Sequence, residues 1–313
     1  MKESLKNLRI GVLMGGKSVE REVSLKSGKA VLNALTGMGY NAFGFDLGEN
    51  FTENLKKIDI CFIALHGTLG EDGRVQGTLD LFGIPYTGSG VCASAIAMDK
   101  IRSKVIFNYY GLKTPPFFFI AKGEDRGIEE NVLKSRFGQF NPPYFVKPNS
   151  SGSSIGCSIV NSTGEELEQA LNNALKYDDE VLVEKYIKGR EIQFAVVSGN
   201  PLGCIEVKPK DTFYSYAAKY TKGQTQYLLE PVLTKEEYKA CESAAVNAHK
   251  LIGCKGVSRT DIILDGEGNA VVLEINTLPG LTEFSLVPMI AGNKGISFNE
   301  LIENIIEDAI IEK

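Results

Sequence analysis

The sequence has few of the features that mark membrane, zinc-binding or secreted proteins. No apolar run reaches the roughly 18–20 residues of a membrane span, and the polar start from Met1 to Asn7 has no signal-peptide core. Only two histidines occur in 313 residues, which disfavours a histidine-rich zinc site. The six cysteines are scattered and form no CxxC pair, so we expect buried free thiols in a reducing cytoplasm.

An excess of positive charge is also missing. Lys and Arg total 34 against 39 Asp and Glu, and the net charge of −5 disfavours a broad surface for nucleic acid or an anionic membrane. A local basic pocket remains compatible with this balance. The composition, 43% apolar and 23% charged, is typical of an ordinary soluble globular protein. At about 100–200 residues per domain, the length predicts two or three domains.

The pattern along the chain divides it into three units. Residues 1–98 alternate strands and helices, and the nearly continuous apolar run from Ile58 to Leu65 is typical of a strand in a parallel sheet. This part predicts a doubly wound α/β unit. Residues 99–188 predict a smaller α+β unit, and residues 189–313 open with antiparallel strands. Within the third unit, residues 208–227 are polar and rich in tyrosine, which predicts a long loop that acts as a lid.

Two apparent nucleotide motifs are discounted. Residues 11–18 match the phosphate-loop pattern G-x-x-x-x-G-K-[ST], but their middle residues, Val12 to Met14, are needed inside a buried strand. A plain strand-turn-helix is favoured there. Residues 88–93 resemble a dinucleotide fingerprint, but no acidic residue follows about 20 positions later.

The most informative stretch is a predicted hairpin over residues 258–276, where two apolar strands flank a glycine-rich turn. If the turn centres on Glu267 and Gly268, Asp261 faces Glu274 and Arg259 faces Asn276. The period-two alternation of a strand places these four side chains on one face. The same register places four apolar residues on the other face: Ile262, Leu264, Leu273 and Ile275.

The chemistry of this polar face predicts a metal site. Two directly opposed acids, Asp261 and Glu274, repel each other unless a cation lies between them. Oxygen ligands suit a hard ion, and so few protein ligands favour Mg²⁺ that also binds phosphate oxygens. Two alternatives stay open: a solvated polar face of an edge hairpin, or an ion-pair cluster around Arg259.

Further segments indicate a phosphate-binding and nucleotide-binding site. Lys147 precedes a turn of small residues, 150–156, whose backbone amides can approach a phosphate closely, although a flexible surface turn is the alternative. Lys100 and Lys219 are further candidate cations. Residues 184–187 and Glu191 lie at the joint between the second and third units, a common place for a nucleotide.

Several long segments together resemble a known family over essentially the whole chain. They are residues 15–25, the H-G-x-x-G-E-D-G match at residues 66–73, and residues 278–282 and 285–288. The chain resembles the D-alanine–D-alanine ligases of bacterial cell-wall synthesis. The resemblance implies a three-domain ATP-grasp fold that combines α/β and α+β parts, and a cytoplasmic homodimer. It also implies the reaction of ATP with two D-alanines through an acyl phosphate.

The resemblance implies roles for the residues that match the family's motifs. Two Mg²⁺ or Mn²⁺ ions would be bound by Asp261, Glu274 and Asn276. ATP would be bound by Lys100, Lys147, Ser154, Glu184, Lys185, Ile187, Glu191 and Lys219. The two D-alanines would be bound by Glu20, His66, Lys219, Arg259, Gly280, Ser285 and Leu286. Catalysis would rest on Glu20, Ser153, Tyr220, Arg259 and Gly280, with Ser153 and Tyr220 joined to Glu20 by hydrogen bonds that lock the lid.

Two rival functions remain at this point. One is a non-enzymatic nucleotide-binding or regulatory protein on the same fold, and the other is a ligase that joins D-alanine to D-lactate or D-serine. The lid carries Tyr220 and has no histidine. Because tyrosine is neutral near pH 7, it does not repel an incoming ammonium, so we expect D-alanine as the second substrate.

Overall fold

The computed structural model describes residues 5–48, 50–123, 140–210, 213–215, 218–219, 221 and 223–311. In these ranges no helix is both long and apolar enough to span a membrane. Tyr220 lies outside the described residues, and so do residues 124–139.

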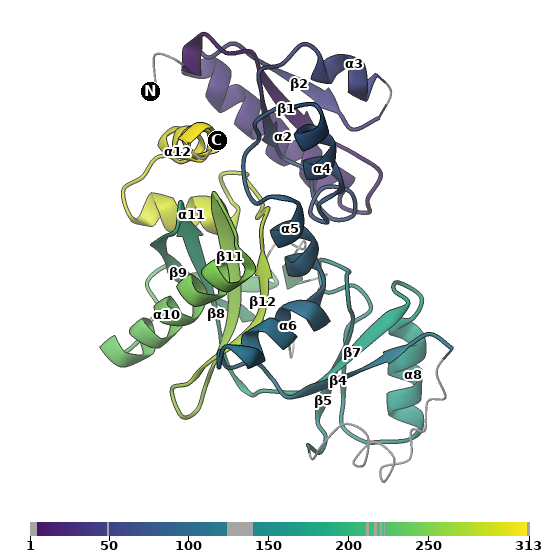
Figure 1. The fold of residues 1–313 in the computed structure, drawn as a ribbon. Coiled ribbons are helices and arrows are strands. Elements are labelled where there is room, and N and C mark those ends of the chain that lie inside the picture. Colours follow the sequence, from purple (N-terminus) through teal and green to yellow (C-terminus); the bar gives the residue numbers. More distant parts are fainter. Residues whose placement is uncertain are drawn as a thin grey trace.

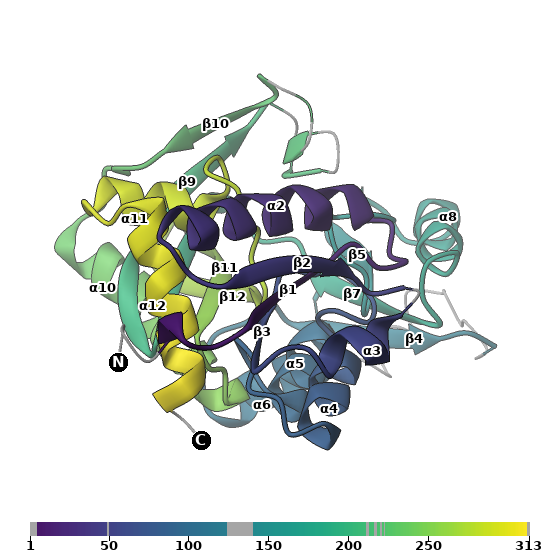
Figure 2. The ribbon, with the colours of Figure 1, turned by 90° about the horizontal axis from the view of Figure 1, so that it is seen from above.

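The N-terminal unit, purple to blue in Figure 1, is built on a parallel sheet of three strands in the order β2-β1-β3 (Figure 2). Their bounds are Ile10–Met14 for β1, Ala42–Asp46 for β2 and Ile60–Ile63 for β3. Helix α2 (Arg21–Gly37) lies along one face, as Figure 2 shows from above, and α3 (Phe51–Leu55) and α4 (Arg74–Leu81) contribute to a core on the other. All of β1 is buried, which confirms that residues 12–14 serve the sheet and do not cradle phosphate.

The central unit is an antiparallel sheet of four strands in the order β4-β7-β5-β6. The strands are β4 (Phe117–Ala121), β5 (Tyr144–Pro148), β6 (Ser158–Val160) and β7 (Glu180–Lys185). Helix α8 (Glu165–Ala174) supplies Leu167 and Leu171 to the core beneath this sheet. The predicted small α+β unit is therefore present.

The C-terminal unit is an antiparallel sheet in the order β10-β9-β8-β11-β12. The strands are β8 (Gly189–Val197), β9 (Asn200–Pro209), β10 (Thr225–Leu228), β11 (Val257–Asp265) and β12 (Ala270–Asn276). One face packs on α10 (Lys235–Ile252), α5 (Val91–Met98) and α6 (Lys100–Tyr109). The other face shares a core with the N-terminal sheet, α11 (Leu286–Asn293) and α12 (Phe298–Ile311), so the first and third units are packed together.

The hairpin of β11 and β12 has the predicted register at its site end. Arg259 pairs with Asn276 and Asp261 with Glu274, but a bulge after Asp261 pairs Ile262 with Val272. The bulge leaves Leu273 as an extra residue, and it lines the same cavity as Asp261 and Glu274. The prediction that Leu273 lies on the opposite, apolar face is therefore wrong, and Val272 takes that place in the core.

The lid loop is shorter than the predicted 208–227. Its first two residues end β9 and its last three belong to β10, because Lys208 and Pro209 pair with Gln226 and Thr225 in the sheet. A tyrosine-rich sequence is compatible with a strand as well as with a loop.

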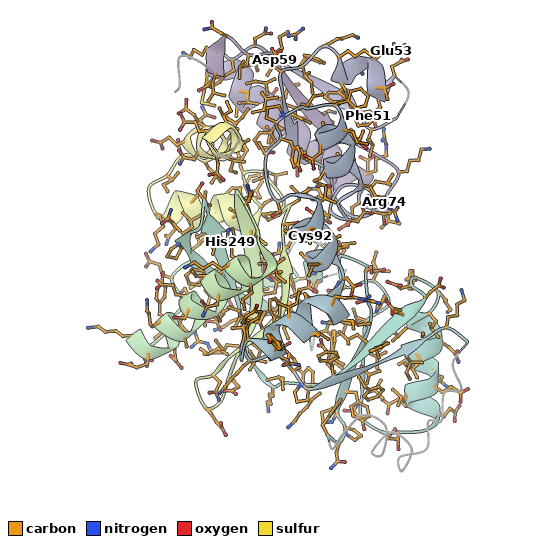
Figure 3. The ribbon with its side chains drawn as sticks, in the orientation of Figure 1. Phe51, Glu53, Asp59, Arg74, Cys92 and His249 are labelled. Atoms are coloured by element: carbon orange, nitrogen blue, oxygen red, sulfur yellow. The ribbon has the colours of Figure 1, made fainter. Side chains whose placement is uncertain are left out.

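All six cysteines are free thiols. Four are buried, as the absence of CxxC pairs predicts: Cys61, Cys204, Cys241 and Cys254. Cys92 on α5 is exposed (Figure 3), and Cys157 is half-buried.

Candidate active site

A cavity of about 490 Å³ lies between the central and C-terminal sheets. Its volume is in the range of small-molecule sites. Strands β5 and β7 and helix α6 form one side, and β8, β9 and the β11–β12 hairpin form the other. The cavity brings together ten of the residues predicted from the sequence: Lys100, Lys147, Ser154, Glu184, Lys185, Ile187, Glu191, Lys219, Asp261 and Glu274.

At one end of the cavity, two carboxylates face each other across the hairpin. Asp261 pairs with Glu274 in the β11–β12 register, and Lys100 Nζ lies 3.6 Å from Glu274 Oε2. Burial opposes the ionisation of Glu274, but the positive charges around it, Lys100 first, lower its pKa to about 2. Glu274 is therefore ionised at neutral pH.

Arg259 contacts the other carboxylate with two hydrogen bonds. Its Nε donates to Asp261 Oδ1 at 2.7 Å and its Nη2 donates to Asp261 Oδ2 at 3.1 Å. Burial would lower the pKa of Arg259, but the charge of Asp261 outweighs it and raises the pKa. The ion pair around Arg259, which was one alternative from the sequence, is therefore present, and Asp261 takes part in it while also facing Glu274.

The residues at this end fit a divalent cation. The donors are carboxylate and amide oxygens, and a carboxylate that accepts hydrogen bonds keeps further lone pairs for a metal. Burial, and then the nearby charge of Asp261, raise the pKa of Glu191 to about 7. Among the described residues no three His, Cys, Asp or Glu side chains form a closed metal cage, so an ion here would need oxygens from a ligand or water. Asn276 Oδ1 accepts a hydrogen bond from the Leu278 amide at 2.9 Å, which fixes its side chain.

At the other end of the cavity, Glu184 is buried between two lysines. Its Oε1 lies 2.7 Å from Lys104 Nζ and 3.1 Å from Lys147 Nζ. Burial opposes ionisation, but the two ammonium groups lower the pKa of Glu184 below its usual range. Next to it, the Phe145 and Phe213 rings pack edge to face at 5.3 Å between centroids. An ionised acceptor beside aromatic and aliphatic walls suits a planar base that carries an amino group.

The serine-rich turn is fixed in place. Lys100 Nζ donates to the carbonyl oxygens of Asn149 at 3.2 Å and Ser151 at 2.9 Å. Ser153 and Ser154 adopt φ angles of 53° and 56°, a left-handed conformation that is uncommon for residues other than glycine. Ser154 Oγ donates to the carbonyl oxygen of Tyr214 at 2.9 Å, so the turn is bonded to the lid.

Lys219, the lysine predicted in the lid, lines the cavity. Lys219 Nζ lies 5.0 Å from the centroid of the Tyr214 ring, within cation–π distance. The Tyr214 and Tyr227 hydroxyls lie 2.8 Å apart, which ties the lid to β10. This arrangement places Lys219 near Glu274, whose pKa it helps to lower.

A second group of predicted residues lies where the N-terminal unit meets the C-terminal unit. Ser153 Oγ donates a hydrogen bond to Glu20, as the resemblance implies. His66 Nε2 lies 3.1 Å from Ser27 Oγ, and burial lowers the pKa of His66 while the charge of Glu20 opposes that shift. Arg259 also influences His66, so the two units contribute charges to one region. The second histidine, His249, lies on α10 (Figure 3), where its Nδ1 is 2.7 Å from Ser258 Oγ in the core.

The C-terminal motif residues also adjoin this region. A Cβ placed on Gly280 would lie 2.9 Å from Ser285 Oγ, which shows how closely the two residues approach. Ser285 Oγ is held 2.8 Å from Thr282 Oγ1. Leu286 begins α11 and packs against the shared core.

Three residues at the site had no role predicted from the sequence. Lys104 is fully buried one helical turn after Lys100, and Glu71 accepts a hydrogen bond from the Gly67 amide at 2.6 Å. Tyr214 bonds the lid to the serine turn. Two signals in the sequence could have identified two of these residues. Lys104 follows Lys100 by four positions, which places both on one helix face, and Glu71 lies within the glycine-rich signature at residues 66–73.

Two family models and several known proteins are similar to this chain. Residues 44–89 match the family model described as D-ala D-ala ligase N-terminus, and residues 106–307 match D-ala D-ala ligase C-terminus. The chain is 46% identical over 312 residues to a D-alanine–D-alanine ligase of Citrifermentans bemidjiense, which covers 99% of both chains. It is 47% identical over 311 residues to that of Geobacter sulfurreducens, covering 98% of this chain and 96% of the relative.

Solved structures give the same result for the fold. The D-alanine–D-alanine ligase from Bacillus anthracis complexed with ATP has a TM-score of 0.85 at 36% identity, covering 97% of this chain and 98% of that one. The VanG D-Ala:D-Ser ligase from Enterococcus faecalis has a TM-score of 0.83 at 29% identity, covering 96% and 99%.

Proposed function

The chain belongs to the D-alanine–D-alanine ligase family, and from this premise we propose that it joins two D-alanines at the expense of ATP, releasing ADP and phosphate. The observation that carries the proposal is the cavity between the two ATP-grasp sheets. Its wall includes an opposed pair of acids, a carboxylate that is ion-paired to lysine, and five lysines, among them Lys100, Lys147 and Lys219. This arrangement suits a nucleotide triphosphate with its base near Glu184 and its phosphates near Asp261 and Glu274.

The first step activates a carboxylate that is otherwise a poor acylating agent. A carboxylate oxygen of the first D-alanine attacks the γ-phosphorus, the bond from that phosphorus to ADP breaks, and an acyl phosphate forms. Such a transfer depends on positioning and on cations around negative oxygens. Three of these cations are the side chains of Lys100, Lys147 and Lys219. Mg²⁺ or Mn²⁺, as two ions bound by Asp261, Glu274 and Asn276, would add positive charge at the phosphates.

The second step joins the two amino acids. Glu20 holds the ammonium of the first D-alanine, with His66 nearby. The amine of the second D-alanine attacks the acyl carbon, a tetrahedral oxyanion forms, and phosphate leaves. Arg259 and the Gly280 amide donate to that oxyanion, and such a donor contributes roughly 3–4 kcal/mol. Ser285, Leu286 and Lys219 receive the second substrate, while Tyr220 and Ser153 complete the link from the lid to Glu20.

The remaining assignments follow from the same family membership. Ser154, Lys185, Ile187 and Glu191 complete the nucleotide site, with Glu191 near the ribose. We propose a division into residues 1–98, 99–188 and 189–313, a homodimer, and a place in the cytoplasm. The product would serve as a precursor of peptidoglycan.

The experiment that tests the function is identification of the product by mass spectrometry. The purified protein is given ATP, Mg²⁺ and D-alanine at pH 7, together with D-serine and D-lactate as competing acceptors. We expect D-alanyl-D-alanine as the main product, with one ADP formed per dipeptide. A predominance of the D-serine dipeptide or the D-lactate ester would overturn the assignment of the acceptor, and ATP binding without any ligated product would indicate a nucleotide-binding protein.

A further inference from the structure

Helix α6 carries two buried lysines, Lys100 and Lys104, that form ion pairs with two acids of the cavity wall, Glu274 and Glu184. Lys100 and Lys104 are four residues apart, so they lie on the same face of the helix, one turn from each other. Lys100 reaches the phosphate end, where its Nζ lies 3.6 Å from Glu274 Oε2. Lys104 reaches the base end, where its Nζ lies 2.7 Å from Glu184 Oε1.

Lys104 does not touch the cavity itself. Its side chain is 0% exposed, and it is absent from the cavity wall, whereas Glu184 is part of that wall. Its Nζ also donates to Thr114 Oγ1 at 2.7 Å, and Thr114 Oγ1 in turn donates to the Val272 carbonyl at 2.8 Å. Among these contacts of Lys104, Glu184 is the one that lines the cavity, so we expect Lys104 to act on a nucleotide through Glu184.

We propose that Lys104 is a positioning residue that sets the preference for adenine by keeping Glu184 an ionised acceptor in a fixed orientation. The proposal rests on the function proposed above, in which the base lies at Glu184. For both lysines, the contact that defines the ion pair is to Glu184 Oε1. An ionised carboxylate only accepts hydrogen bonds, so it favours the 6-amino group of adenine over the 6-carbonyl group of hypoxanthine or guanine.

Removal of Lys104 should change this selection without leaving an unpaired charge. The cluster holds one carboxylate and two ammonium groups, so Lys104→Met leaves Glu184 paired with Lys147 alone. With one cation fewer in a buried site, Glu184 is more easily protonated, because burial disfavours its charged form. A protonated carboxyl donates a hydrogen bond, and it therefore accepts a 6-carbonyl base.

The test compares ATP with ITP, which bears a carbonyl group in place of the 6-amino group and N1–H in place of the N1 lone pair; the N1 difference is the same for every variant. Binding constants for both nucleotides are measured by calorimetry with Mg²⁺, and kcat/KM for dipeptide formation is measured in parallel. We expect Lys104→Met to lower the ATP/ITP preference about 10- to 100-fold, the range of one hydrogen bond to a charged group. The loss should appear in the nucleotide KM while kcat changes little.

Four further variants make the result specific. Glu184→Gln, whose amide both donates and accepts, should lower the same ratio, and Lys104→Met combined with Glu184→Gln should lower it no further. Thr114→Val removes the hydroxyl partner and keeps the ion pair, so it should preserve the preference. Lys104→Gln serves as a second neutral variant if Lys104→Met folds poorly.

An unchanged ATP/ITP ratio in both Lys104 variants, or in Glu184→Gln, would overturn the inference. Additive losses in the double variant would also overturn it, because Lys104 would then act independently of Glu184. Failure of the proposed ligase function is a separate outcome, since it appears as missing dipeptide in the wild-type protein while nucleotide binding remains measurable.

Discussion

Glu71 is a buried carboxyl whose charge state should make the stability of the protein depend on pH. It is 9% exposed, and burial, followed by the nearby charge of Glu20, raises its pKa from 4.5 to about 8. Between these two values the folded protein binds more protons than the unfolded chain, so the free energy of unfolding falls as pH rises through this window. Glu71→Gln keeps an oxygen acceptor for the Gly67 amide and never becomes charged.

The size of the effect follows from the two pKa values. Each pH unit between them corresponds to about 1.4 kcal/mol, so Glu71→Gln should gain at most roughly 5 kcal/mol relative to the wild type between pH 4.5 and about 8. Above about pH 8 the difference should stay constant, because Glu71 is then ionised in both states of the wild-type chain.

The assay is urea unfolding of both proteins at a series of pH values from about 5 to about 9. Glu22→Gln, a substitution of an exposed carboxylate on α2, serves as the matched control and should show no such trend. A stability difference between Glu71→Gln and the wild type that is the same at every pH would refute the reasoning.

Three other predictions concern the reaction itself. Glu274→Gln should abolish turnover and Mg²⁺-dependent ATP binding while leaving the fold intact, and near-normal activity at low millimolar Mg²⁺ would contradict the metal assignment. Arg259→Met should lower kcat by at least about 100-fold with little change in ATP affinity. A normal kcat with reduced stability would mean that Arg259 only forms a structural ion pair. Amide hydrogen exchange around Lys219 should be fast without ligand and slow with ADP, Mg²⁺ and a phosphinate analogue of the intermediate, and equal protection in both states would mean a fixed loop.

The hairpin shows how far the sequence could predict the site. Alternation of apolar and polar residues fixed the pairing of Asp261 with Glu274 and of Arg259 with Asn276, because a slip by one residue would expose the whole apolar face. The same pattern could not reveal the bulge, since Val271, Val272 and Leu273 are all apolar and any of them can fill the core. Leu273 was therefore assigned to the wrong face.

The buried lysine cluster shows what the sequence could not predict. Lys104 reads as one more polar residue of a basic helix, and a lone lysine on a helix is ordinarily solvated. It is buried only because β7, from a later part of the chain, brings Glu184 against α6. Long-range pairings of this kind carry no local periodicity, so only the tertiary structure identifies them.

The choice of the second substrate depends on side chains and not on the fold. The VanG D-Ala:D-Ser ligase has nearly the same fold at 29% identity, so the scaffold alone does not distinguish one acceptor from another. A lactate hydroxyl competes best where the amine stays protonated and is repelled by a nearby cation, as a histidine in the lid would do. This chain has no histidine between His66 and His249, and Tyr220 stands in the lid. Because a phenol is neutral near pH 7, a tyrosine at this position adds no such repulsion to an approaching amino acid, and D-alanine should outcompete D-lactate in the same reaction mixture.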